Sequence, residues 1–172
     1  MQSKHLFILA IALLVNTLQS QILLVPERVF DGKEIHNRWV VAIDSNRISY
    51  AGPLSDLKRA SSYTKKELKG MTLMPGIIEG HSHLLLHPYN ETEWNDQVLK
   101  ESPTERAIRG SVHAKNSLMA GVTAMRDLGS EGAGYTDIYL KKTIDDGIIP
   151  GPRTLMAGPA IVATGAYGQK GF

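Results

Sequence analysis

A chain of 172 residues, 42% hydrophobic and 21% charged, has the composition of a globular protein that can bury a core. Its 19 basic and 17 acidic residues nearly balance, so charge gives no reason to expect a nucleic-acid partner. The absence of cysteine excludes disulfides, thiolate zinc sites and cysteine nucleophiles, so any metal must be held by histidine, carboxylate or lysine-derived oxygen ligands.

The first twenty residues have the order of parts of a secretory signal peptide. Lys4 precedes an apolar run from Leu6 to Val15, and a polar stretch follows that ends at Ser20. The run is shorter than the roughly 20 apolar residues that a membrane-spanning helix needs. We therefore predict a signal peptide over residues 1–20 and a secreted or periplasmic protein that meets a membrane only through that peptide. The alternative is an uncleaved N-terminal membrane anchor.

Residues 21–75 are predicted to form a small β domain. Residues 22–32 and 39–52 are rich in β-branched and aromatic side chains, which favours strands. Breaks between the strands are expected at Asp31-Gly32, Ser45-Asn46 and Ala51-Gly52.

The end of this domain has a different composition. Residues 55–70 are polar and are predicted to be weakly helical, and residues 71–76 read as one more strand that ends at the Pro75-Gly76 turn. We find no internal repeat.

After Gly76 the pattern alternates between strands and helices. A buried strand that runs out into its loop is expected at residues 77–86, and further strands are expected at 122–129 and 153–162, with helices at 102–121 and 136–147 between them. Ser102, Pro103 and Glu105 form a helix start signal, and an apolar face is expected from the spacing of Ala107, Ile108, Val112, Ala114, Leu118 and Met119. Alternation of this kind predicts an α/β fold with a parallel sheet.

Three of the six histidines, His81, His83 and His87, lie in or just after the first of these strands. His81 and His83 are two positions apart, so in an extended segment their side chains point to the same face. Two neutral imidazoles at the end of a strand can occupy two positions around one divalent metal. Such a site is incomplete, because catalytic zinc normally takes three protein ligands and a water.

Three ordered motifs resemble one family. "LMPGIIEGHSH" at residues 73–83 resembles a signature of the metal-dependent amidohydrolase superfamily. "GVTAMRDLG" and "GPRTLMAGPAI" resemble the following strands of its imidazolonepropionase-like branch, to which Xaa-Pro dipeptidases are similar. The resemblance implies that residues 76–172 form about the first three strands of a (β/α)₈ barrel. It also implies that residues 21–75 form the N-terminal half of a small β-sandwich.

The resemblance also implies a site. His81 and His83 would be metal ligands for one or two divalent ions, with zinc as the leading candidate, and Glu79 stands where the family more often has aspartate. The remaining ligands and the aspartate that acts as general base would come from beyond Phe172, so no catalytic residue is expected within this chain. Tyr167 replaces a histidine of related members, and Tyr167 and His87 are candidate substrate-binding residues.

The implied activity is hydrolysis of an amide or cyclic amide bond by metal-activated water, with a small molecule or dipeptide as substrate. The chain is too short for a closed barrel, which needs roughly 250 residues. We therefore expect it to be the N-terminal portion of a larger protein and inactive alone, and a homo-oligomer is compatible with it. The alternatives are a non-catalytic truncated binding or degenerate module and a His-x-His metal phosphoesterase.

Plainer interpretations exist for several of these residues. His81 and His83 could be surface histidines, and His87 could be an exposed loop residue. Arg126 and Asp127 either point into the site or form an internal ion pair that holds the loop. Asn90 lies in a glycosylation sequon, which matters only for a eukaryotic exported protein.

Overall fold

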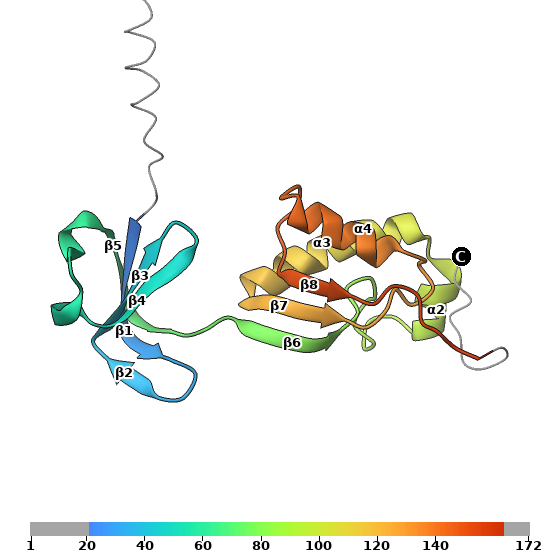
Figure 1. The fold of residues 1–172 in the computed structure, drawn as a ribbon. Helices are drawn as coiled ribbons and strands as arrows, with labels where there is room; N and C mark the ends of the chain where they lie inside the picture. The colour runs from blue at the N-terminus through green and yellow to red at the C-terminus, as the bar shows by residue number, and fades with distance from the viewer. Residues whose placement is uncertain (1–20, 164–172) are drawn as a thin grey trace, which may run out of the picture. The chain divides into compact units, whose positions relative to one another are not determined.

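The computed structural model describes residues 21–163, which divide into two compact units between Pro75 and Gly76 (Figure 1). The predicted signal peptide and Tyr167 lie outside the described residues. Within residues 21–163, no helix combines the length and apolar character needed to cross a bilayer.

The N-terminal unit is a five-stranded mixed sheet. Its strands are β1 (Gln21–Phe30), β2 (Ile35–Asn37), β3 (Trp39–Asp44), β4 (Arg47–Pro53) and β5 (Thr64–Leu73). The order is β2-β1-β3-β4 with antiparallel pairs, and β5 pairs with β1 in parallel. The predicted β domain is therefore observed as a single sheet organised around β1.

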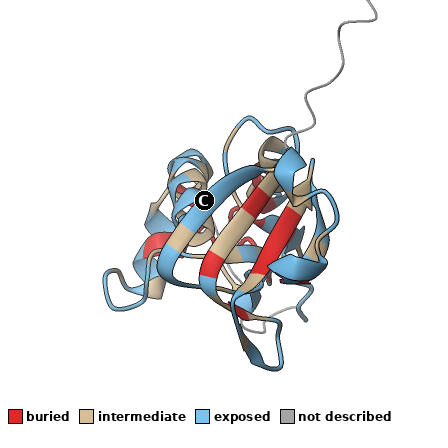
Figure 2. Ribbon diagram, turned by 90° about the vertical axis from the view of Figure 1, so that its left-hand side faces the viewer, coloured by how far each residue is buried: buried red, intermediate tan, exposed pale blue. Residues whose placement is uncertain are grey.

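The core of this sheet is formed by apolar side chains of β1 and β3. Leu23, Val40 and Ala42 are buried, and Figure 2 shows buried positions on neighbouring strands of the sheet. Tyr50 and Tyr63 pack against this cluster from β4 and from the segment before β5. Burial of these aliphatic and aromatic groups is the main stabilising contribution to the unit.

Two of the three predicted breaks are confirmed. Asp31-Gly32 separates β1 from β2, and Ser45, with a φ of 58°, lies in the tight turn between β3 and β4. The predicted break at Ala51-Gly52 is wrong, because both residues lie within β4 and pair with β3.

The weakly helical segment predicted at 55–70 is also largely wrong. Only two short 3₁₀ turns occur there, η1 (Leu54–Asp56) and η2 (Ala60–Ser62), and β5 begins at Thr64. β5 forms because its backbone pairs with β1, in a register that begins at Ile22 opposite Thr64. Backbone pairing does not require apolar side chains, which explains how a polar segment adopts a strand.

The C-terminal unit is a three-stranded parallel sheet with helices. Its strands are β6 (Ile77–Ser82), β7 (Val122–Asp127) and β8 (Arg153–Met156), in the order β6-β7-β8. The helices are α2 (Trp94–Lys100), α3 (Pro103–Met119) and α4 (Thr136–Asp145). α3 packs against β7 and α4 against β8 (Figure 1), as the α/β prediction requires.

The start and end of α3 are confirmed. The Ser102 hydroxyl accepts a hydrogen bond from the backbone N–H of Glu105 at 3.2 Å, and Pro103 occupies the first helical position. After the helix, Gly121 has a φ of 97°, a conformation that a residue with a Cβ rarely adopts.

The predicted apolar face of α3 is confirmed in part, because Ala114 is buried and Ala107 and Leu118 are half-buried. Arg106, Gly110 and Ala114 are the buried positions, whereas Ile108 and Val112 are exposed. Gly110 packs closely against the core. A Cβ at this position would lie only 2.9 Å from a methyl carbon of the buried Leu85, which leaves no room for a larger residue. The side of α3 that packs inward is therefore rotated from the one that the apolar pattern indicated.

Other boundaries also differ from expectation. The segment 77–86 is a strand that runs out into its loop, as expected, but the strand itself is not buried: β6 ends at Ser82 with Ile78 78% exposed, and the buried Leu84, Leu85 and Leu86 follow in a turn. β8 ends at Met156 rather than near residue 162, and α2 was not predicted. The core beneath the helices contains Leu84, Leu85, Ala114, Met125, Ala133 and Leu140.

Candidate metal and substrate site

The two histidines of the sequence motif lie together at the carboxyl end of β6. His81 is within the strand and His83 is the first residue after it, and their ring centroids are 5.4 Å apart. Both side chains line an open cleft of about 490 Å³, which is also lined by His87, Tyr89 and His113 among others. The geometry brings together the two imidazoles that sequence reasoning proposed as ligands.

The imidazole of His83 is held from one side. Its Nδ1 lies 3.2 Å from the backbone carbonyl oxygen of Gly129, in the loop after β7. A carbonyl oxygen only accepts, so Nδ1 is the protonated nitrogen that donates this hydrogen bond. Nε2 then keeps its lone pair, which is the form of histidine that binds a metal.

Glu79 interacts with its own strand. Its carboxylate accepts a hydrogen bond from the backbone N–H of His81 at 2.8 Å. The residue therefore stabilises the extended backbone that presents His81 to the cleft.

Asp127 joins the loops that follow β6 and β7. Its buried carboxylate accepts hydrogen bonds from the backbone N–H groups of Leu84, at 2.6 Å, and Gly129, at 3.2 Å. Burial raises the pKa of Asp127 above its ordinary value, although both hydrogen bonds and the nearby His83 act in the opposite direction. The contact fixes the turn that contains His83.

Arg126 and Asp127 do not form the ion pair that the sequence left open. Arg126 is exposed, and its Nε donates to the backbone carbonyl of Gly80 at 2.8 Å, which links β7 to β6. Asp127 is buried and faces the turn after β6. Adjacent residues of a strand point to opposite faces, so the two side chains have separate partners.

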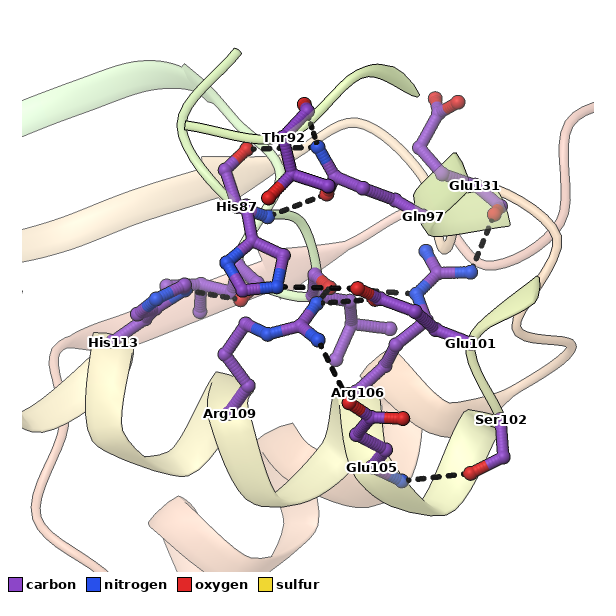
Figure 3. A network of polar contacts seen from close by, with 12 residues as sticks. His87, Thr92, Gln97, Glu101, Ser102, Glu105, Arg106, Arg109, His113 and Glu131 are labelled. Carbon is purple, nitrogen blue, oxygen red and sulfur yellow. Dashed lines mark hydrogen bonds and ion pairs between the residues drawn. The ribbon is translucent and has the colours of Figure 1, made fainter. Parts of the chain in front are cut away.

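His87 takes part in a polar network with α2 and α3 (Figure 3). Its Nε2 lies 3.2 Å from a carboxylate oxygen of Glu101, and Arg109 lies 2.7 Å from the other oxygen. The backbone N–H of His87 donates to the side-chain oxygen of Gln97 at 2.6 Å. His87 is therefore a fixed residue of the cleft wall, and its contact with substrate stays a prediction.

Arg106 holds the loop after β7 from below (Figure 3). This side chain is 1% exposed and its guanidinium donates to the backbone carbonyls of Ser130 at 2.9 Å and Glu131 at 2.8 Å. It also donates from Nε to the carbonyl of Leu85 at 3.4 Å. One buried cation therefore satisfies three carbonyl groups around the candidate site.

Sequence reasoning missed the supporting residues. It did not single out Glu101, Arg106 or Glu131. His113 is a further residue beside the site, and its Nδ1 lies 3.0 Å from the carbonyl oxygen of Leu84. A signal existed for Arg106, because spacing by four places it on one helix face with the small residues Gly110 and Ala114. No local pattern indicated Glu131.

The residues present fit part of a metal site. His81 and His83 offer two imidazole nitrogens on one side of a strand end, and no group of three histidine or acidic side chains suited to a metal occurs among residues 21–163. Catalytic zinc commonly uses three protein ligands. The described residues therefore offer two of the three protein nitrogens or oxygens that such a site would need.

Comparison with known proteins gives related enzymes, although no family model matches the chain. The chain is 29% identical over 142 residues to ochratoxinase from Aspergillus niger, covering 81% of this chain and 28% of that protein. A solved Xaa-Pro dipeptidase with bound methionine is 25% identical, with a TM-score of 0.69, over 85% of this chain and 35% of its own. A solved amidohydrolase superposes with a TM-score of 0.68 at 24% identity, over 84% of this chain and 33% of its own.

These similarities are consistent with the amidohydrolase superfamily. The resemblance read from the sequence motifs is thereby confirmed, and the mixed α/β fold agrees with these structures. The chain spans about 28% of the length of the curated relatives that it matches.

Proposed function

We propose that the protein containing this chain is a metal-dependent hydrolase of amide carbon–nitrogen bonds, with His81 and His83 as two of its metal ligands. The observation that carries the proposal is the pair of imidazoles at the end of β6, with Nδ1 of His83 engaged by a carbonyl and Nε2 available. Similarity to ochratoxinase and to an Xaa-Pro dipeptidase supports the reaction class.

The chain's own residues prepare the site. His81 and His83 would hold a divalent metal, with zinc as the leading candidate, and when bound it would provide Lewis acidity toward the carbonyl and toward a water nucleophile. Glu79 holds the backbone of His81, and the carbonyl of Gly129 orients the ring of His83. Asp127 fixes the turn that follows His83 by accepting a hydrogen bond from the backbone N–H of Leu84. The other ligands and the general base would come from outside the described residues 21–163.

The proposed substrate is a small amide or a dipeptide. The cleft beside the histidines has a volume of about 490 Å³, which is within the roughly 300–1,000 Å³ of small-molecule sites. His87, held by Glu101 and Gln97, provides one polar group on its wall. Tyr167 is retained as a second candidate for substrate contact on the basis of the sequence motif alone.

The surrounding architecture is proposed from the same resemblance. Residues 76–172 would form the first strand–helix units of a (β/α)₈ barrel, and residues 21–75 would form half of a small β-sandwich. We also propose export with removal of residues 1–20, which the N-terminal sequence of the mature protein would test; retention of Met1 would contradict it. A homo-oligomer stays compatible with this proposal.

The decisive experiment replaces both ligands in the intact gene product. His81→Ala combined with His83→Ala should remove bound zinc and should reduce hydrolysis of dipeptides and acyl amides. Removing a residue that only hydrogen-bonds to a metal ligand costs up to roughly 100-fold in activity, so removing the two ligands themselves should reduce the rate by more than that. Metal content by mass spectrometry and initial rates are the measurements.

The matched control is His36→Ala. His36 lies in β2 of the N-terminal sheet, and its replacement should leave metal content and rate unchanged. Retention of metal and activity in the double variant would refute the assignment. Hydrolysis of phosphate esters but not of amides by the wild type would favour the phosphoesterase alternative.

A further inference from the structure

Glu131 lies in the loop after β7, behind the candidate ligand His83. Its Oε1 is 3.6 Å from Nδ1 of His83, and its side chain is only 12% exposed. The same Nδ1 makes the hydrogen bond to the carbonyl of Gly129, so two acceptors of one loop face one ring nitrogen.

The carboxylate of Glu131 is fixed in place. Its second oxygen, Oε2, accepts a hydrogen bond from the indole N–H of Trp94 at 3.1 Å. Its backbone carbonyl is bound by the buried guanidinium of Arg106 at 2.8 Å (Figure 3). The residue also has a φ of 49°, a conformation that a residue other than glycine adopts at some cost and that the surrounding contacts must maintain.

We propose that Glu131 is a positioning residue for His83. This inference rests on the proposed function, because it concerns the orientation of a ligand of that site. The negative charge next to Nδ1 favours the tautomer that is protonated at Nδ1, makes the imidazole a stronger ligand and keeps Nε2 directed toward the cleft. Trp94 and Arg106 act on His83 through Glu131 and its loop.

The two oxygens near Nδ1 of His83 interact with it in different ways. The carbonyl of Gly129, at 3.2 Å, accepts the hydrogen bond, whereas the Glu131 oxygen, at 3.6 Å, is beyond hydrogen-bond distance and acts mainly through its charge. A low exposure of both side chains reduces screening of this interaction by water. Loss of the charge should therefore weaken the ligand without removing its hydrogen bond.

The test uses Glu131→Gln in the intact gene product, with zinc affinity measured by competition with a chelator. Removal of a residue that supports a metal ligand typically costs about 10–100-fold in affinity, and we expect a loss of about tenfold. The second readout is the tautomer of His83 in the metal-free protein, from ¹⁵N NMR of histidine-labelled protein, with its signal assigned by its absence in His83→Ala. A reduced share of the form protonated at Nδ1 is expected.

Trp94→Phe keeps the carboxylate but removes the indole donor that anchors it, and a smaller loss of zinc affinity with the same direction of tautomer change is expected. It also provides the test if Glu131→Gln does not unfold cooperatively. Glu91→Gln is the matched control, because Glu91 is exposed on a turn and the change removes the same charge.

Unchanged zinc affinity and an unchanged His83 tautomer in folded Glu131→Gln would overturn this inference alone. In the event that Glu131→Gln is misfolded, the same result in Trp94→Phe would overturn it. A wild-type protein that binds no zinc, or binds it equally well without His81 and His83, would instead overturn the proposed function.

Discussion

Arg106 shows how much of the candidate site depends on one residue outside it. It comes from α3, is 1% exposed, and binds the carbonyls of Leu85, Ser130 and Glu131. These carbonyls belong to the two loops that follow β6 and β7, which carry His83 and its partners. A planar guanidinium suits this task because its donors are fixed in one fork.

We expect Arg106→Met to lower the free energy of unfolding by about 2–4 kcal/mol, because buried carbonyl groups would lose their donors. Chemical denaturation monitored by circular dichroism is the measurement. Lys115→Met is the matched control on the same helix; this residue is exposed, and its replacement should change stability by less than about 0.5 kcal/mol. Equal effects of the two substitutions would contradict the role given to Arg106.

At the scale of elements, the turn between β1 and β2 has an explicit electrostatic basis. The Asp31 carboxylate accepts hydrogen bonds from the backbone N–H groups of Glu34 and Lys33, at 2.9 and 2.8 Å, and lies 2.8 Å from Nε2 of His36. The backbone bond from Glu34, then His36 and Lys33, hold the pKa of Asp31 well below its ordinary value.

This pKa direction predicts a pH dependence. A carboxylate with a lowered folded pKa stabilises the fold above the ordinary pKa of about 3.8, and this contribution is lost as pH falls below it through the folded pKa. We expect Asp31→Asn to reduce the loss of stability of the N-terminal sheet on acidification. Unfolding between pH 5 and 2 can be followed by Trp39 fluorescence in a Trp94→Phe background.

The control for this turn is Glu34→Gln, which keeps the backbone donor to Asp31 and should preserve the wild-type acid profile. An identical acid profile for wild type and Asp31→Asn would show that the turn contacts do not contribute to stability.

At the scale of the whole molecule, the parallel sheet exposes apolar side chains on one face. Ile78 of β6 is 78% exposed and Leu155 of β8 is 68% exposed. The register Ile78–Ala124 and Arg126–Leu155 places them on the same face of the sheet. Exposed apolar faces and unpaired strand edges favour association.

We therefore expect a protein consisting of residues 21–172 to self-associate at micromolar concentration. Ile78→Lys combined with Leu155→Lys should shift it toward monomer in light scattering coupled to size-exclusion chromatography. Ile148→Lys, at a position that is 69% exposed in a loop, is the control for added charge and should have little effect. A wild-type protein of residues 21–172 that stays monomeric would contradict this expectation.

The alternation of strands and helices, the capping of α3 by Ser102 and the pairing of His81 with His83 could all be predicted from the sequence. These features depend on neighbours within a few residues, whose periodicity and hydrogen-bonding groups are visible locally. The family motifs also belong to this class, because each is a short continuous segment.

The tertiary structure alone decided the remaining features. β5 is a strand because β1 offers its edge, and Arg106 is buried because the loops after β6 and β7 present carbonyls to it. Glu131 faces His83 across 48 positions of sequence because β6 and β7 are adjacent in a parallel sheet. Contacts between distant segments are set by packing and backbone pairing, which leave no periodic trace in either segment by itself.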